Sequence, residues 1–213
     1  PLFRCKGAVL GKRSRWQQRQ QADPYVAEAR RAGYRSRAAF KLIQLDDRDG
    51  FLTEGAVVVD LGAAPGGWTQ VARQRVGPEG RVVAIDRLPM EAVPGTEFLQ
   101  ADFATDEGLE AFRALLGETP VDVVLSDMAP ELSGIKLADQ ARAMELCDLA
   151  VEFARETLRP GGSLVMKAFQ GEGFDELLRG LRADYARAAA RKPKASRGES
   201  AEQYLVARGF RGN

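Results

Sequence analysis

One short stretch constrains the fold of this chain more than any other. Residues 57–68 read Val-Val-Val-Asp-Leu-Gly-Ala-Ala-Pro-Gly-Gly-Trp, an apolar run that ends in an acid and is followed by a glycine-rich bend. This pattern is typical of an open α/β sheet, in which ligands bind at the carboxyl ends of the strands. A dinucleotide site would instead show G-x-G-x-x-G, with glycines that admit a pyrophosphate. Because alanines and a proline occupy this bend, the sequence favours a nucleoside ligand without phosphate groups.

Acidic residues end two further apolar runs. Residues 82–85 lead into Asp86, which is placed to accept hydrogen bonds from two ribose hydroxyls, and residues 98–100 precede Asp102, which could accept from an adenine amino group. The three features together fit S-adenosylmethionine, whereas the bend alone is also compatible with a tight turn that binds nothing. We predict that the cofactor-binding residues are Gly62, Ala64, Pro65, Gly66, Gly67, Trp68, Asp86, Asp102 and Asp127.

Apolar strands alternate with amphipathic helices along the chain. This alternation predicts a Rossmann-like α/β fold, with a seven-stranded, mostly parallel sheet and helices on both faces. We expect strands near residues 57–60, 81–85, 97–100, 121–126, 163–167, 185–190 and 203–208. We expect helices at residues 23–32, 36–46 and 138–158, and one that opens at Thr105. Residues 1–20 have no apolar period, so we expect a mobile basic segment there and a single domain over residues 21–213.

The composition narrows the class of protein. With 45% apolar and 29% charged residues it is ordinary for a soluble domain, and no apolar run approaches the length of a membrane span. The start of the chain lacks the apolar centre of a signal peptide, and its two cysteines form no disulfide or metal framework. We therefore expect a cytoplasmic protein, and a monomer. The absence of histidine removes the commonest general base and metal ligand, so we expect no metal.

Charge is strongly segregated along the chain. The net charge is +9 over residues 1–45, −13 over residues 46–184 and +5 over residues 185–213. Basic blocks at both ends of an acidic core indicate a bound polyanion, although a single basic run is more often a solvated helix face. The predicted RNA-binding residues are Arg30, Arg31, Arg35, Arg37, Arg191, Lys192, Lys194 and Arg197.

The residues after the fourth predicted strand indicate the methyl acceptor. Asp127 and Met128 provide no aromatic ring to hold a planar amine, and Cys147 lies in a predicted helix rather than at the sheet edge where carbon-5 methylation needs a nucleophile. An oxygen acceptor remains, and its proton needs a base. Lys167, at the end of the fifth predicted strand, is the candidate because the chain has no histidine, although it could simply extend into solvent. Spacing alone says little about Lys41 or Glu202.

Several long segments, taken together and in order, resemble the FtsJ-like RNA 2′-O-ribose methyltransferases, and above all those that act on 23S ribosomal RNA of the large subunit. These segments are residues 34–42, 59–68, 126–130, 167–174 and 191–197. The likeness covers nearly all of the chain from about Ser14 to Ala207. It departs from the family pattern around Glu202 and at residues 131–132.

The resemblance implies an S-adenosylmethionine-dependent methyltransferase fold and a catalytic tetrad of two lysines and two acids. The tetrad maps onto Lys41, Asp127, Lys167 and Glu202. It also implies that the substrate is a uridine ribose in the peptidyl-transferase A-loop, modified on an assembled large subunit. Within the family, transfer RNA and the mRNA cap are alternative substrates. A small-molecule O-methyltransferase would not need the basic ends, and a non-catalytic RNA-binding protein would not need the tetrad.

Overall fold

A seven-stranded sheet forms the centre of the computed structural model, which describes residues 23–212. The strand order is β3-β2-β1-β4-β5-β7-β6. The strands are β1 (Val57–Leu61), β2 (Arg81–Asp86), β3 (Glu97–Gln100), β4 (Val121–Ser126), β5 (Leu158–Phe169), β6 (Tyr185–Arg191) and β7 (Glu202–Phe210). Strands β1 to β5 pair in parallel, whereas β7 is antiparallel to both of its neighbours, β5 and β6. The predicted mostly parallel sheet of seven strands is confirmed.

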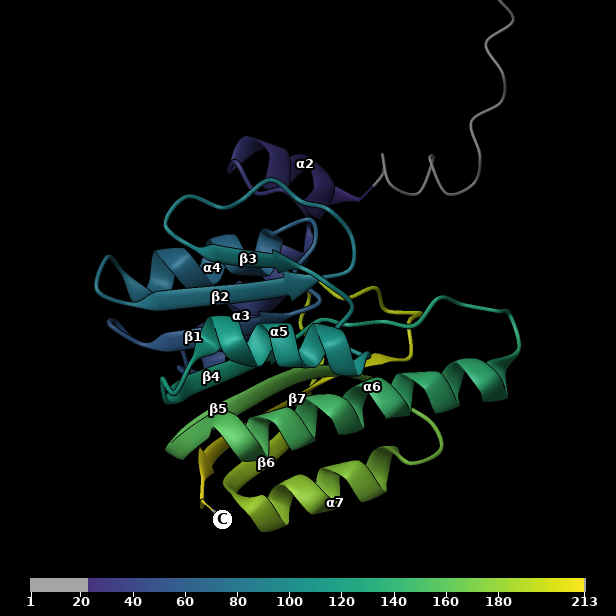
Figure 1. Ribbon diagram of the computed structural model, residues 1–213. Coiled ribbons are helices and arrows are strands. Elements are labelled where there is room, and N and C mark those ends of the chain that lie inside the picture. The colour runs from purple at the N-terminus through teal and green to yellow at the C-terminus, as the bar shows by residue number, and fades with distance from the viewer. Residues whose placement is uncertain (1–22, 213) are drawn as a thin grey trace, which may run out of the picture.

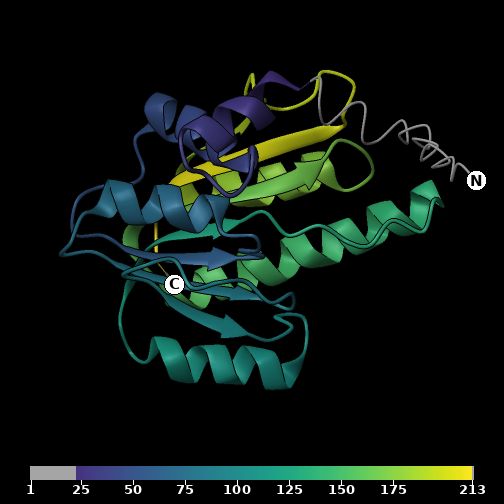
Figure 2. The ribbon, with the colours of Figure 1, turned by 90° about the horizontal axis from the view of Figure 1, so that it is seen from above.

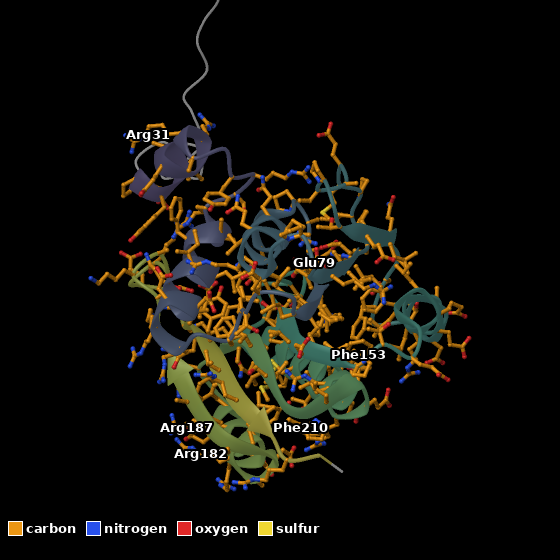
Figure 3. The ribbon with its side chains drawn as sticks, turned by 90° about the vertical axis from the view of Figure 1, so that its left-hand side faces the viewer. Arg31, Glu79, Phe153, Arg182, Arg187 and Phe210 are labelled. Atoms are coloured by element: carbon orange, nitrogen blue, oxygen red, sulfur yellow. The ribbon has the colours of Figure 1, made fainter. Side chains whose placement is uncertain are left out.

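Helices cover both faces of this sheet, as predicted (Figures 1 and 2). They are α2 (Pro24–Arg31), α3 (Ala38–Asp49), α4 (Gly67–Val76), α5 (Asp106–Leu116), α6 (Lys136–Thr157) and α7 (Phe174–Asp184). Helices α3 and α4 pack on one face, with α2 against α3. Helices α5, α6 and α7 pack on the other face, where Phe153 of α6 points into the core (Figure 3).

The two-residue period of the strands decides which face each side chain meets. Val58 of β1 packs beneath α3 and α4, whereas its neighbour Val59 packs beneath α5 to α7. On β5, Val165 and Met166 divide between the faces in the same way. Lys167 follows Val165 by two residues, so the strand directs it toward the face that α3 covers.

The two largest differences from the predicted boundaries are at β5 and α3. The strand expected at residues 163–167 begins at Leu158, the residue predicted to end the preceding helix. Val121 pairs with Leu158 and Val123 with Ser163, so residues 159–162 bulge opposite a single residue of β4. A bulge accommodates Pro160, which has no amide hydrogen for a ladder, and Gly161 at a φ of 86°. Helix α3, expected at residues 36–46, runs on to Asp49, where Gly50 ends it at a φ of 60°.

The expected mobile segment, residues 1–20, lies outside the described residues, so that domain boundary stays a prediction. None of the helices between residues 23 and 212 is long and apolar enough to cross a membrane.

We expect Gly62→Ala to cost more stability than Gly50→Ala. Both glycines have positive φ, of 74° and 60°, and the left-handed conformation strains other residues by about 1–2 kcal/mol. Only at Gly62 would a Cβ also clash with another segment of the protein, since it would lie 2.7 Å from Met128 Cγ and 3.0 Å from the Met128 backbone nitrogen. Displacing that backbone should cost a further ~1–3 kcal/mol. Urea unfolding of both variants tests this, and equal losses would show that the close approach to Met128 is unimportant.

Candidate active site

The predicted catalytic residues meet at one edge of the sheet. The parallel strands β4 and β5 end there, which places Asp127 directly after β4 and Lys167 near the end of β5. Because β7 is antiparallel to β5, it begins at this same edge, with Glu202 opposite Phe169 and Tyr204 opposite Lys167. The remaining residue, Lys41, comes from α3, which packs over this face.

One hydrogen-bond network joins the four predicted residues through Tyr204. Lys41 Nζ donates to Glu202 Oε1 at 2.6 Å and to the Tyr204 hydroxyl at 3.0 Å. The Tyr204 hydroxyl in turn donates to Asp127 Oδ1 at 3.0 Å. Lys167 Nζ donates to the backbone oxygen of Asp127 at 2.6 Å and lies 3.1 Å from Asp127 Oδ1. The tetrad is therefore two lysine-carboxylate pairs connected by a tyrosine.

The network is largely withdrawn from water. The side chain of Lys167 is 8% exposed and that of Asp127 is 19% exposed, so electrostatic interactions between them are stronger than at the surface. Burial raises the pKa of Tyr204, and the nearby carboxylates of Asp127 and Glu202 raise it further, so the hydroxyl keeps its proton. Lys41 also lies 5.4 Å from the centre of the Tyr204 ring, within range of a cation-π interaction.

Tyr204 was missed in the sequence analysis. A signal for it existed, because it follows Glu202 by two residues in a predicted strand and must share its face. Glu202 has a second partner, Ser196, whose hydroxyl donates to Oε1 at 2.9 Å.

A small hollow opens beside Lys41 and Glu202. It has a volume of about 210 Å³ and is lined by Arg37, Ala38, Lys41, Arg197, Ser200 and Glu202. Arg37 is held in place by an ion pair with Asp23, the N-cap residue of α2, and Arg197 lies 3.9 Å from the same carboxylate. Two arginines at the rim of a hollow beside the tetrad suit a ligand that carries phosphate.

The predicted cofactor site is a separate cavity of about 500 Å³. Of the residues predicted to bind the cofactor, the lining includes Gly62, Ala64, Asp86, Asp102 and Asp127. Asp86 is oriented by two backbone amides, since its carboxylate accepts from Ala64 at 2.9 Å and from Leu88 at 2.8 Å. The lining also has apolar residues that the sequence analysis did not identify, among them Ile85, Phe103 and Met128. Acids and apolar surface together suit an adenosine group.

The other four predicted cofactor residues, Pro65, Gly66, Gly67 and Trp68, do not line this cavity. They lie where α4 packs against the segment before α3. Trp68 is buried, its Nε1 donates to the backbone oxygen of Ala38 at 2.9 Å, and its ring lies 5.6 Å from that of Tyr204. A Cβ on Gly67 would come within 2.4 Å of Ser36 Oγ. The structure thus gives these residues a packing role.

The predicted RNA-binding residues divide by their partners. Four of them bind the protein itself, among them Arg37, whose guanidinium pairs with Asp23 and donates to the backbone oxygen of Ala195. Arg35 donates to the backbone oxygens of Pro65 and Ala92, and Arg191 makes two hydrogen bonds to Asp49, at 2.9 and 3.0 Å. Lys192 donates to backbone oxygens of the following loop, including that of Ser200 at 2.6 Å.

The remaining predicted RNA-binding residues are better placed for a ligand. Arg197 borders the hollow beside the tetrad, as does the ion-paired Arg37. Arg30 and Arg31 are exposed at the end of α2, and Lys194 is exposed in the loop between β6 and β7. Figure 3 shows Arg31 at the outer edge of the molecule, far from Arg182 and Arg187.

Asp60, near the end of β1, is fully buried two residues before the glycine-rich bend. Thr69 Oγ1 donates to its Oδ2 at 2.6 Å, but its Oδ1 has no hydrogen-bond partner within residues 23–212. Burial raises the pKa of Asp60 to about 7, the charges of Asp127 and Asp86 add to the rise, and the Thr69 hydrogen bond opposes it. This carboxyl therefore titrates near neutral pH.

Comparison with known proteins gives concordant results. The family model for FtsJ-like methyltransferases matches residues 34–210. The ribosomal RNA large subunit methyltransferase E of Alkalilimnicola ehrlichii is 51% identical over 92% of this chain and 94% of its own length. The protein of that name from Pseudomonas aeruginosa PAO1 is 50% identical over 93% of this chain and 96% of its own length. A crystal structure of a protein from Plasmodium falciparum, described as a ribosomal RNA methyltransferase, superposes with a TM-score of 0.73. It is 30% identical and covers 84% of this chain and 100% of its own.

We expect Asp60→Asn to remove a pH dependence of stability. The pKa of this carboxyl is higher in the folded chain than the value of about 3.9 in the unfolded chain, so its contribution is largest below about pH 4 and is lost as the pH rises through about 7. The wild type should lose on the order of 4 kcal/mol between those limits relative to Asp60→Asn. Urea unfolding of both proteins at about pH 4, 6 and 8 measures this, and parallel profiles would contradict it.

Proposed function

Because this chain belongs to the FtsJ-like methyltransferase family, we propose that it transfers the methyl group of S-adenosylmethionine to a ribose 2′-oxygen of ribosomal RNA. The acceptor in this proposal is a uridine of the peptidyl-transferase A-loop in 23S ribosomal RNA, on the large ribosomal subunit. The arrangement around Asp127 carries the proposal. This residue lines the cofactor cavity and also binds Lys167, so an acceptor oxygen at Lys167 would lie next to the methyl donor.

Position distinguishes the two lysines. A tyrosine hydroxyl has one proton, and that of Tyr204 goes to Asp127, so the hydroxyl accepts from Lys41. Lys41 also binds Glu202, and neither of its two acceptors lines the cofactor cavity. Lys167 instead contacts the backbone oxygen and Oδ1 of Asp127, which does line that cavity. An amine that has given up one proton keeps two N–H groups for these contacts and a lone pair for the hydroxyl proton, which supports Lys167 as the general base.

The residues that line the cavity of about 500 Å³ fit S-adenosylmethionine. Asp86 and Asp102 offer carboxylates for the ribose and the adenine, and Phe103 and Ile85 offer apolar surface for the base. Bound there, S-adenosylmethionine would supply a methyl group on a positively charged sulfur, which becomes neutral on transfer. Lys167 Nζ takes up the 2′-hydroxyl proton as that oxygen forms its bond to carbon. Lys41 stabilises the developing negative charge, while Asp127 and Glu202 orient the two lysines.

RNA as the substrate rests on the surface around the tetrad and on the relatives. Arg37 and Arg197 border the hollow beside Lys41 and Glu202, where a phosphate next to the target ribose would lie. Close relatives of the chain are methyltransferases of large-subunit ribosomal RNA. A small-molecule acceptor would have no need of the exposed arginines at the end of α2.

We expect Lys167→Ala to lower methyl transfer about 10²–10⁴-fold, the usual loss for a positioned base. Lys167→Arg should restore little, because a guanidinium stays protonated and cannot accept the hydroxyl proton. Single-turnover methylation of undermodified large ribosomal subunits measures the rate, and mass spectrometry of the nuclease digest identifies the modified nucleoside. Lys136→Ala, which removes an exposed lysine at the start of α6, is the matched control and should not change the rate.

Calorimetry with S-adenosylmethionine completes this test, since Lys167→Ala should keep cofactor affinity. Near-normal turnover by Lys167→Arg would exclude Lys167 as the base. A methyl group on the uracil ring would overturn the 2′-oxygen as acceptor, and methylation of transfer RNA alone would overturn the choice of substrate.

A second prediction concerns the exposed cations. If Arg30, Arg31 and Lys194 bind phosphates, replacing all three by glutamine should make the salt dependence of RNA binding less steep. The slope of log affinity against log salt concentration should fall in magnitude by roughly 0.7–0.9 for each phosphate that is no longer neutralised. The control removes three arginines from α7 and β6, at Arg179, Arg182 and Arg187, which Figure 3 places partly at the far end of the molecule. Filter binding of an A-loop RNA fragment over a salt series measures both slopes. Equal slopes in the two variants would mean that net charge alone attracts the RNA.

A further inference from the structure

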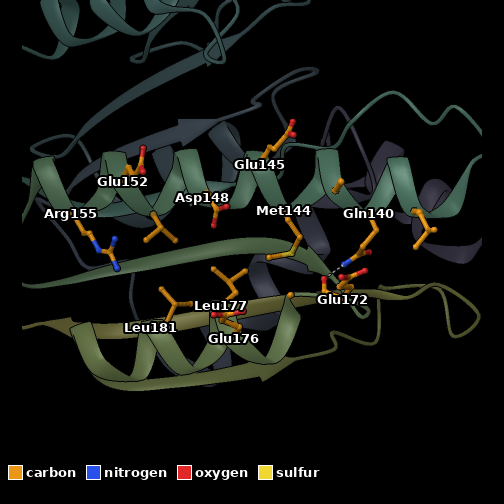
Figure 4. A pocket seen from close by; sticks show the side chains of 15 residues that line it. Gln140, Met144, Glu145, Asp148, Glu152, Arg155, Glu172, Glu176, Leu177 and Leu181 are labelled. Carbon is orange, nitrogen blue, oxygen red and sulfur yellow. Dashed lines mark hydrogen bonds between the residues drawn. The ribbon is translucent and has the colours of Figure 1, made fainter.

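A second large depression lies away from the tetrad, between α6 and α7 (Figure 4). It is an open groove of about 700 Å³ on the face of the sheet opposite to α3. Its α6 wall runs from Leu137 to Arg155 in steps of three and four residues, which is one stripe of the helix about 27 Å long. Its α7 wall repeats at the same spacing between Gly173 and Leu181. The two stripes face each other and have no third helix between them within residues 23–212.

The groove is apolar at its base and negative at its border. We call its apolar lining the groove floor: Leu137, Met144, Val151, Leu177 and Leu181. We call the acids that face the gap in Figure 4 the acidic rim: Asp148, Glu172 and Glu176. Five acids line the groove, the three of the acidic rim with Glu145 and Glu152, against one cation, Arg155. This excess of carboxylates disfavours RNA and favours a cationic ligand. Burial raises the pKa of Asp148, and the excess adds to the rise.

Gly180 gives an independent sign that another chain approaches. It lies inside α7 and lines the groove, although glycine is the least favourable residue in a helix interior apart from proline. A Cβ built at Gly180 would meet nothing within 4 Å, so packing within the described residues does not require a glycine. Ala141 is similarly small on the α6 wall. Small residues on both walls let a third helix lie close to the pair.

We propose that this groove is the docking site for a Lys/Arg-rich amphipathic helix of a partner protein. An apolar helix face resting on the groove floor, with cations over the acidic rim, is a common mode of helix recognition. The length of the α6 wall matches a helix of about 18 residues. The groove shares α6 and the side chain of Glu145 with the cofactor cavity, but none of the four tetrad residues lines it, so the proposal does not depend on the proposed function.

The probe is a fluorescent synthetic peptide of about 18 residues, with leucines at i, i+3, i+4 and i+7 and lysines elsewhere. Its anisotropy is measured with the full chain. A peptide of the same composition in permuted order removes the apolar face, and one with glutamate for lysine reverses the charge. Binding should weaken at least about tenfold with either control peptide.

Two variants of the protein test whether the peptide binds in the groove. Neutralising the acidic rim with Asp148→Asn, Glu172→Gln and Glu176→Gln should weaken binding at least about tenfold. The matched control, Glu107→Gln, Glu110→Gln and Glu118→Gln, removes three exposed acids in and after α5 and should change it less than about twofold. Gly180→Leu should abolish binding by filling the groove, while its thermal midpoint stays at or above that of the wild type because leucine favours the helix.

The following outcomes would overturn the proposal. Equal binding of the permuted peptide, or equal weakening by the control variant, would show attraction by net charge alone. Unchanged binding to Gly180→Leu would place the peptide elsewhere. The chain's own basic start is the competing occupant, and a variant with Lys12→Gln, Arg13→Gln and Arg15→Gln tests it. A tenfold gain in peptide affinity for that variant would assign the groove to residues 1–22 instead of to a partner.

Discussion

The antiparallel pairing of β7 with β5 is the constraint on which the rest of the site depends. Parallel strands place their carboxyl ends together, which accounts for Asp127 and Lys167 but not for any residue at the start of a strand. The reversed strand brings its first residues to that same edge, so that Tyr204 lies opposite Lys167. A parallel β7 would carry Glu202 to the far edge. Because Tyr204 contacts both Lys41 and Asp127, the direction of one strand joins the two lysine-carboxylate pairs.

The sequence could predict those features of the site that depend on a few consecutive residues, but not those that depend on contacts between distant residues. Apolar runs mark the strands, and the acids that end them must converge at one edge, so the pattern alone could predict that Asp86 and Asp102 lie in one cavity, as they do. Lys167 is found in the same way. The contact between Lys41 and Glu202 joins residues 161 positions apart, and no local pattern marks it. Only the resemblance to a family identified that pair.

The remaining differences arise because a sequence does not show which partner a side chain meets. Trp68 directly follows the glycine-rich bend predicted to bind the cofactor, yet its ring packs against Tyr204. Arg35 belongs to a basic run, yet its guanidinium donates hydrogen bonds to the backbone oxygens of Pro65 and Ala92. Arg191 pairs with Asp49, which lies more than a hundred residues earlier. In each case a tertiary contact occupies the group that was predicted to bind a ligand, and the contact can be recognised only in three dimensions.

The position of β7 also bears on how the molecule folds. It is the last strand in chain order, yet it lies inside the sheet and separates β5 from β6. Strand β6 has no place in the sheet until β7 has been inserted, and that insertion also delivers Glu202 and Tyr204. Such pairings between distant segments close slowly because long loops must be ordered first. A chain that has formed β1 to β5 would therefore have the strands that line the proposed cofactor cavity and three of the four predicted tetrad residues, so the proposed cofactor could bind before Glu202 and Tyr204 complete the network.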